Sequence, residues 1–269
     1  MAGTPWRQLW SQATSRDSGR MRIGIGLTTV LALVGVAALN PEVAIAQNRP
    51  PGYPVRGVDS AVYQHPKGAA INWRVVRGGG WSFVVLKASE GTGYTNPWFG
   101  RDIAGARSAG LAVMPYHFWN HRGGVTPVQQ ADHFVSRLRG VGYTGHRPGD
   151  LPPLLDLEGC ATRTTVSAVN AFLTRVQDAF GRTPFVYSSR GSYGGCLSGA
   201  GLGTYPLDVA DYVHSRPALP SGWSSWLIWQ YAGAATVAGM SAAAPVEVFN
   251  GPRSRLDVLA NRCSPRCPI

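Results

Sequence analysis

Short apolar runs alternate along the chain with segments whose apolar positions recur at helical spacing. The apolar runs cover residues 55–59, 82–89, 111–118, 151–158, 184–189 and 225–231. Helices are predicted over 96–110, where Asn96 is the cap and Pro97 the first helical residue, and over 126–140, where Thr126 and Pro127 repeat this arrangement. A third, amphipathic helix over 164–181 is expected to end at its last glycine. Apolar strands separated by helices indicate a parallel sheet covered by helices.

Polar residues at the ends of the apolar runs distinguish between two arrangements of such a sheet. These residues are Asp59, the segment 87–90, His117, Asp156 with Glu158, Ser188 and Gln230. Ligands of parallel α/β folds bind at the carboxyl ends of the strands, which converge on one mouth in a barrel and on a crevice in a doubly wound sheet. Six strand ends with polar tips fit one mouth better, so we predict an α/β fold of the TIM-like β/α barrel type.

The first 46 residues have the features of a secretion signal peptide. Arginines precede an uncharged stretch at 23–39, and the small residues of "AIA" at 44–46 form a cleavage site before Gln47. Met21 is an alternative start, and an uncleaved anchor is the alternative fate, although 17 apolar residues are marginal for spanning a bilayer. We therefore expect residues 1–46 to be removed, 47–54 to be a linker and 55–269 to be one catalytic domain.

The four cysteines agree with export, since all of them follow the predicted cleavage site and their number is even. Three pairings are possible. Cys263 and Cys267 are close enough to clip the C-terminal tail, which leaves Cys160 to pair with Cys196. A zinc site is the alternative, but the C-x-x-C spacing and the nearby histidines that it needs are missing.

The charge of the chain favours anionic partners. Residues 47–269 contain 21 basic and 12 acidic side chains, a net charge of +9, and all but two of the basic residues are arginine. Such a surface is attracted to nucleic acid, anionic lipid or cell-wall polymers, although solubility alone can also explain it. The arginines are scattered through the sequence, so a dedicated nucleic-acid arm is not expected.

The stretch "PLLDLEG" at 153–159 places two carboxylates two residues apart after an apolar run. On a strand, Asp156 and Glu158 would share one face about 6.6 Å apart, while Leu155 and Leu157 face the other layer. Two like charges this close resist simultaneous ionisation, so one group should keep its proton while the other stays charged. Glycoside hydrolysis needs such a pair, although a lone D-x-E is more often an ordinary carboxylate pair held by arginines or helix ends.

Seven segments read together resemble the family 25 glycoside hydrolases, which are secreted lysozymes. They are "GVDSAVYQHPKGAAINW" (57–73), "FVVLKASEGTGYTNPWF" (83–99), "PYHFWN" (115–120), "LPPLLDLEG" (151–159), "FVYSS" (185–189), "PSGWSSWLIWQYAG" (220–233) and "FNGPRSRLDVL" (249–259). The resemblance implies an irregular β/α barrel that cleaves the β-1,4 bond between N-acetylmuramic acid and N-acetylglucosamine, usually described as a retaining reaction with the substrate's acetamido group as nucleophile. It also agrees with the Cys160–Cys196 pairing, which some relatives share.

The resemblance also implies roles for individual residues. Glu158 matches the general acid, Asp156 the group that orients or stabilises the acetamido group, and Asp59 a third active-site carboxylate. The cleft positions expected to hold sugars are Glu90, Tyr116, His117, Tyr187, Trp229 and Gln230, although His117 can equally be a hydrogen-bonded core residue. No metal or cofactor is implied. The expected partner is the peptidoglycan glycan strand, with no nucleic acid, no stable membrane association once the signal is removed, and a monomeric state.

The chain departs from the family pattern near its C-terminus. Pro245 stands where the family carries a further Asp, and Glu247 is the nearest carboxylate and the candidate substitute. A displacement of about 1 Å can cost roughly a hundredfold in rate. Asp208 also replaces a usual Trp, and Pro115 a common Ala. A wall-binding protein with impaired catalysis is therefore the alternative function, and an enzyme acting on another N-acetylated glycan such as chitin is a third.

Overall fold

The computed structural model describes residues 49–120, 124–160, 163–198 and 201–261. Eight of its strands close a ring in the order β1-β11-β10-β9-β7-β5-β4-β2, with β2 pairing back onto β1. These strands are β1 (Arg56–Ser60), β2 (Phe83–Glu90), β4 (Ala112–Phe118), β5 (Leu154–Asp156), β7 (Phe185–Ser188), β9 (Leu207–Ala210), β10 (Ile228–Ala235) and β11 (Ala244–Phe249). The prediction of a barrel is confirmed.

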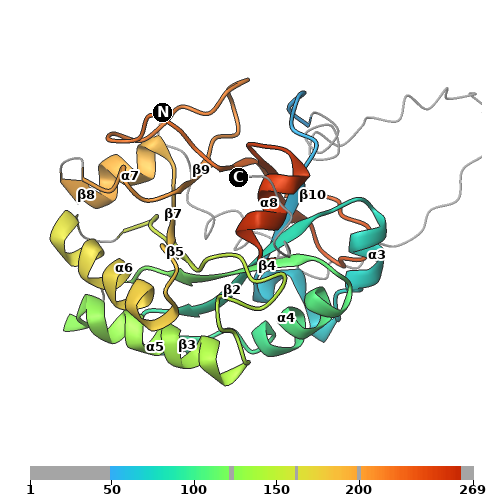
Figure 1. Ribbon diagram of the computed structural model, residues 1–269, viewed down its shortest axis with the longest axis horizontal. Coiled ribbons are helices and arrows are strands. Elements are labelled where there is room, and N and C mark those ends of the chain that lie inside the picture. The colour runs from blue at the N-terminus through green and yellow to red at the C-terminus, as the bar shows by residue number, and fades with distance from the viewer. Residues whose placement is uncertain (1–48, 121–123, 161–162, 199–200, 262–269) are drawn as a thin grey trace, which may run out of the picture. The chain divides into compact units, whose positions relative to one another are not determined.

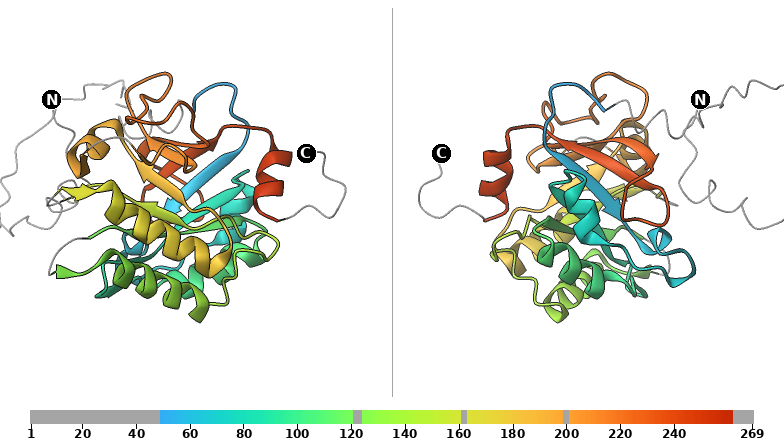
Figure 2. Two further views of the ribbon diagram at one scale, coloured as in Figure 1. Left: turned by 60° about the vertical axis from the view of Figure 1, so that its left-hand side comes forward. Right: turned by 90° about the vertical axis from the view of Figure 1, so that its right-hand side faces the viewer.

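The barrel is irregular because one strand is reversed and the helical layer is incomplete. Strand β11 runs antiparallel to both β10 and β1, whereas the other neighbours are parallel. Figure 2 shows, in its right-hand view, β1 in blue beside the orange-red hairpin of β10 and β11. No described helix joins β9 to β10 or β10 to β11. The strand ends at this side of the mouth are therefore covered by loops.

Helices cover the remaining strands. They are α3 (Trp73–Gly78), α4 (Phe99–Ser108), α5 (Pro127–Gly140), α6 (Val166–Phe180), α7 (Arg190–Cys196) and α8 (Arg253–Leu259). In Figure 1, α4, α5 and α6 lie below the strands, and α8, in red, lies in front of them. Short 3-10 turns follow β1 at Val62–Gln64 and Pro66–Gly68, strand β3 (Tyr94–Thr95) pairs with the end of β2, and β6 (Thr164–Thr165) pairs with β8 (Leu197–Ser198).

The capping signals explain where two of the helices begin and end. Thr126 accepts a hydrogen bond from Gln129 N at the start of α5, and the Gln129 side chain accepts one in return from Thr126 N, with Pro127 at the first position. Helix α6 ends at Gly181, whose φ of 61° is the left-handed conformation that glycine adopts without strain. Both helices form where they were predicted.

The predicted start of α4 is wrong by two residues, since Pro97 was expected as the first helical residue. The helix begins at Phe99, and Asn96 lies outside it. The Asn96 side chain accepts a hydrogen bond from Trp98 N and donates one to the carbonyl of Lys87 at 2.8 Å. The asparagine therefore ties the turn before the helix to strand β2, and it does not cap the helix.

Two layers of side chains fill the structure. One apolar cluster lies between the strands and the surrounding helices, and it includes Val84, Leu86, Val113 and Leu155. The second lies inside the barrel and contains the alternate residues Phe83, Val85, Ala112, Met114, Leu154, Phe185, Ile228 and Phe249. Because side chains alternate along a strand, the second set identifies which later residues of each strand point into the barrel. This alternation places the candidate site.

Candidate active site

Polar side chains take over the barrel interior where the apolar cluster ends. Continuing the alternation toward the carboxyl ends of the parallel strands, and toward the amino end of the antiparallel β11, gives the inward residues Asp59, Lys87, Tyr116, Asp156, Tyr187, Asp208, Gln230 and Glu247. Each of the eight strands contributes one member. The structure therefore brings Asp59, Asp156 and the predicted Tyr116, Tyr187, Gln230 and Glu247 to one end of the barrel, the end at which TIM-type barrels carry their sites.

Glu158 lies just beyond the end of β5, and its position follows from its neighbours. Leu157 is buried in the cluster between strands and helices, and its N–H donates to the carbonyl of Tyr187 at 2.9 Å, so the strand geometry continues past Asp156. Glu158 consequently returns to the inner face, as predicted for residues i and i+2. It is half-buried at the mouth, whereas Asp156 is 7% exposed.

Burial is the main influence on the protonation of these carboxyl groups. Burial raises the pKa of Glu158 to about 7, and the positive charge of Lys87 partly opposes this. Burial likewise raises the pKa of Asp59 to about 7 and that of Asp156 well above its ordinary value, with the charge of Glu158 as the second cause for Asp156. Loss of hydration thus raises the pKa of both groups, and the expectation that one keeps its proton while the other is charged stays a prediction. Glu158 is set to hold and release a proton near neutral pH.

Lys87 is the cation of the site, and the sequence reading did not select it as a site residue. Its ammonium group lies 2.9 Å from Oε2 of Glu90 and 4.6 Å from the centre of the Phe118 ring. Its charge lowers the pKa of Asp59, Asp156 and Glu158. The available signal was its place in β2, where a lysine follows Phe83 and Val85 at inward positions.

A tyrosine–glutamine network lies beside Glu158. The hydroxyl of Tyr187 donates to Oε1 of Gln230 at 3.0 Å, and the hydroxyl of Tyr212 donates to the same oxygen. The charge of Glu158 contributes to raising the pKa of both tyrosines, after burial. Tyr212, which is 43% exposed, was also missed, because it lies in a loop after β9 where no apolar pattern singles it out.

Glu90 lies at the rim of the site. Besides its ion pair with Lys87, its Oε1 accepts a hydrogen bond from Nδ2 of Asn120 at 3.0 Å. Glu90 is thus held by two neighbours, close to the carboxylates through Lys87. This position agrees with its predicted contact to sugar, which the structure itself does not test.

Two predicted cleft residues point away from the barrel interior. His117 is fully buried between β4 and the helices, where its ring is hydrogen-bonded to Ser89 and Gln130. Burial lowers its pKa to about 3. Trp229 is 2% exposed, and its Nε1 donates to the carbonyl of Asp211 at 2.7 Å. Both follow an inward residue by one position, so the alternation turns them outward, and their assignment to the cleft is corrected to a role in packing.

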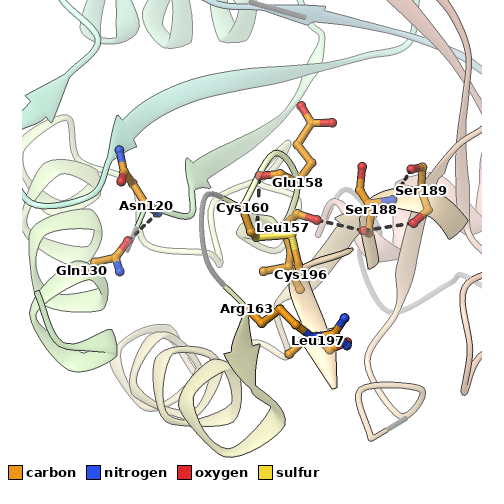
Figure 3. The surroundings of a disulfide bond; sticks show 11 residues. Asn120, Gln130, Leu157, Glu158, Cys160, Arg163, Ser188, Ser189, Cys196 and Leu197 are labelled. Atoms are coloured by element: carbon orange, nitrogen blue, oxygen red, sulfur yellow. Dashed lines mark hydrogen bonds between the residues drawn. A yellow bond between two sulfur atoms is a disulfide. The ribbon is translucent and has the colours of Figure 1, made fainter. Parts of the chain in front are cut away.

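A disulfide holds the segment that follows Glu158. Cys160 and Cys196 are bonded, as predicted, with Cα atoms 5.2 Å apart, and the bond joins this segment to the end of α7. Figure 3 shows the Glu158 carboxyl pointing away from the sulfur atoms, while the carbonyl of Leu157 accepts a hydrogen bond from Ser188 on β7. The backbone on both sides of Glu158 is therefore anchored. The predicted bridge between Cys263 and Cys267, and the predicted signal at 1–46, lie outside the described residues.

Glu247 and Asp208 are also inside the barrel, and both are fully buried. Glu247 lies opposite Gly57 in the β1–β11 pair, so it stands one inward position below Asp59. Extending the same register places Pro245 opposite Asp59 itself. Among the described residues, no group of three or more His, Cys, Asp or Glu side chains is arranged to hold a metal ion. The chemistry available at this end of the barrel is that of clustered carboxyl groups, tyrosine hydroxyls and one ammonium group.

Comparisons with known proteins agree with this chemistry. A family model described as "Glycosyl hydrolases family 25" matches residues 58–240. Lysozyme M1 of Streptomyces globisporus is 32% identical over 218 residues, which are 77% of this chain and 71% of that protein. The N,O-diacetylmuramidase of Chalaropsis sp is 34% identical over 191 residues, 65% of this chain and 87% of that one. The crystal structure of the bacterial lysozyme from Streptomyces coelicolor matches with a TM-score of 0.69 at 29% identity, over 78% of this chain and 98% of its own.

Proposed function

The chain belongs to family 25 of the glycosyl hydrolases and is a peptidoglycan hydrolase of the lysozyme type, and on this premise we propose how its residues break the glycosidic bond. The bond is the β-1,4 linkage between N-acetylmuramic acid and N-acetylglucosamine. The observation that carries the proposal is the position of Glu158, half-buried at the barrel mouth beside two further carboxyl groups, with its pKa raised to about 7.

In the first step Glu158 is the general acid. Its raised pKa keeps the carboxyl group protonated in mildly acidic solution, where an ordinary glutamate is ionised. The proton passes to the glycosidic oxygen as the bond to the sugar carbon breaks, which leaves Glu158 as a carboxylate. The carbonyl oxygen of the substrate's acetamido group forms the new bond to that carbon, so positive charge develops on the acetamido group.

Asp156 and Asp59 act on this developing charge. As a carboxylate, Asp156 accepts a hydrogen bond from the acetamido N–H and stabilises the positive charge that spreads onto the group. Asp59, whose pKa is linked to the charges of Lys87 and Glu158, adds negative potential beside the pair. In the second step the Glu158 carboxylate takes a proton from water, which attacks the sugar carbon and releases the acetamido group.

The remaining inward residues are proposed to hold the sugars. Tyr187 and Tyr212 present ring faces and hydroxyl groups around Glu158, and Gln230 fixes both hydroxyls. Aromatic faces with polar edges match sugar rings, which have an apolar face and a polar rim. Tyr116 is placed to join them from β4, where it is 7% exposed.

The bond that is cut can be read from the products. Purified peptidoglycan is digested with residues 47–269, and the released fragments are reduced with borohydride and identified by mass spectrometry. The proposal expects reduced N-acetylmuramic acid at the ends of the fragments. Reduced N-acetylglucosamine would contradict the proposed linkage, and release from chitin but not from peptidoglycan would contradict the assigned substrate.

We also propose that the protein acts outside the cell after removal of residues 1–46. The relatives are lysozymes and muramidases, whose substrate is the cell wall, and the net charge of +9 on residues 47–269 would attract an anionic wall. N-terminal sequencing of the exported protein should begin at Gln47. Wall affinity should weaken as salt is added, and affinity that does not respond to salt would contradict the electrostatic part.

A further inference from the structure

Two additional buried acids lie in the barrel interior near the catalytic carboxyl groups. Asp208 comes from β9 and Glu247 from β11, and both are 0% exposed. Neither carboxyl oxygen of Asp208 has a hydrogen-bond partner within the described structure, whereas hydrogen bonding with Gln230 lowers the pKa of Glu247. Gln230 lies opposite Glu247 across the β10–β11 pair. Buried polar groups are nearly always paired, so an unpaired carboxyl group inside the barrel requires an explanation.

The charge of the interior decides their protonation. The titratable side chains that interact with these two acids are Asp59 on β1, Asp156 on β5, Tyr212 after β9 and Tyr231 on β10, and the two acids also interact with each other. Lys87 is a cation that acts on Asp59 and Asp156, and it is not among the charges that shift the pKa of Asp208 or Glu247. Burial raises the pKa of Asp208 and of Glu247 well above ordinary values, and the charge of Asp59 adds to this in both cases. Burial therefore favours the neutral form of Asp208 and of Glu247.

Asp59 and Asp156 each have a carboxyl oxygen that lacks a hydrogen-bond donor. Oδ1 of Asp59 and Oδ1 of Asp156 are buried and have no hydrogen-bond partner. A carboxylate oxygen only accepts hydrogen bonds, whereas a neutral carboxyl group can donate one. Asp208 is close enough for its charge to affect Asp156, and both Asp208 and Glu247 respond to the charge of Asp59. A neutral Asp208 could therefore donate a hydrogen bond to a neighbouring carboxylate oxygen that has no donor.

We propose that Asp208 and Glu247 are positioning residues for the hydrolysis, which as neutral acids donate hydrogen bonds, directly or through one water, to Oδ1 of Asp59 and of Asp156. This stabilises Asp59 and Asp156 as carboxylates and opposes the effect of their burial. The inference rests on the proposed roles of Asp59 and Asp156. The two acids would act by setting the protonation of Asp59 and Asp156 and not by touching the substrate, since both are fully buried.

The test compares variants that keep the donor with variants that remove it. Asp208→Asn and Glu247→Gln retain a neutral donor of similar shape, whereas Asp208→Leu and Glu247→Met do not. Initial rates on solubilised peptidoglycan fragments are measured across pH for each. We expect the rates of the Asn and Gln variants to stay within about threefold of the wild-type rate. The acid limb of the pH–rate profile, where the rate rises with pH, should stay in place in these variants. In the Leu and Met variants the acid limb should move up by about one pH unit, because Asp59 and Asp156 then take up protons earlier.

Other outcomes overturn the proposal. An acid limb that stays in place in the Leu and Met variants, with only a lower melting temperature, would show that the two acids are merely structural. An acid limb that moves to lower pH in Asp208→Asn would show that Asp208 is an anion in the working enzyme, since removing a repelling charge favours ionisation of its neighbours.

A second measurement does not depend on turnover, so it separates this inference from the proposed function. The ¹³C carboxyl signals of labelled aspartates are followed by NMR, with assignments from Asp208→Asn and from asparagine variants at Asp59 and Asp156. Asp208 should remain protonated at a pH where an ordinary aspartate is ionised. The Asp59 and Asp156 signals should titrate at higher pH in Asp208→Leu than in Asp208→Asn. If Asp208 titrates like an ordinary aspartate, the inference fails even in an active enzyme. If no peptidoglycan is cleaved, the proposed function fails, but these titrations still show whether Asp208 donates a hydrogen bond to Asp59 or Asp156.

Discussion

Removing the disulfide next to the catalytic acid tests how the position of Glu158 is maintained. The bond joins Cys160 to Cys196 across a sequence separation of 36 residues. In the chain-entropy relation, closing a loop of this length in the unfolded state contributes about 4 kcal/mol at 25 °C. For a domain of this size, each kcal/mol corresponds to roughly 2–4 °C in melting temperature. The double exchange to alanine at both positions should therefore lower the melting temperature by roughly 8–15 °C.

The same exchange should also reduce activity below the melting temperature. Cys160 follows Glu158 by two residues, and the segment between them includes Gly159 at a φ of 58°. Displacements of about 1 Å at a reacting group can cost on the order of a hundredfold, so we expect kcat to fall by about ten- to a hundredfold. Calorimetry and rates at 25 °C measure the two effects. A double exchange to serine is the control, since losing the bond should dominate over the polarity of the replacement.

One result would refute this reasoning. If the alanine pair melts within about 2 °C of the wild type and keeps its rate, packing alone positions the loop. Cys196 is 1% exposed within the apolar cluster between strands and helices, which makes that alternative physically reasonable. The outcome thus distinguishes a covalent anchor from a packed one.

Three further predictions follow from the site. The rate should fall above about pH 7 as Glu158 loses its proton, and stability should fall between about pH 4.5 and 7, because a raised native pKa means that the folded state binds more protons there; a rate limb near pH 4.5 would contradict the raised pKa. Lys87→Met should lower the free energy of unfolding in urea by about 3–5 kcal/mol and move the alkaline limb of the pH–rate profile to higher pH. Lys87→Arg keeps the charge and should change the stability and the limb much less. An unmoved limb in Lys87→Met would show that Lys87 does not act on the carboxyl groups. His117→Ala should cost about 2–4 kcal/mol of stability, since its ring packs 5.1 Å from that of Phe172, while KM stays within about twofold; a large rise in KM would return His117 to the cleft.

The barrel was predictable from sequence where its strands are apolar, and less so where they are not. The six apolar runs each overlap a barrel strand. The two missed strands, β9 (Leu207–Ala210) and β11 (Ala244–Phe249), each carry a buried acid, Asp208 or Glu247, and such residues are rarely found inside a strand core. The buried acid in each of these strands therefore interrupts the apolar run that would have predicted the strand.

The site was predictable to the extent that alternation along a strand could be followed. Asp156 and Glu158 are two residues apart, and their shared face could be deduced without a structure. His117 and Trp229 each lie next to an inward residue, and a register error of one reverses the side of the sheet. The raised pKa of both carboxyl groups also needed the structure, since it depends on how deeply the barrel buries them.

The most direct test of the account is the release of reducing sugar from purified peptidoglycan by residues 47–269, compared with Glu158→Gln. Glutamine keeps the shape of the side chain but cannot deliver a proton, and its folding is checked by its melting temperature. The account predicts that the wild type releases sugar and that the variant loses activity by a factor on the order of 10³ or more, because general acid catalysis contributes about 10²–10⁴. A folded variant that cleaves within about tenfold of the wild type would contradict Glu158 as the general acid.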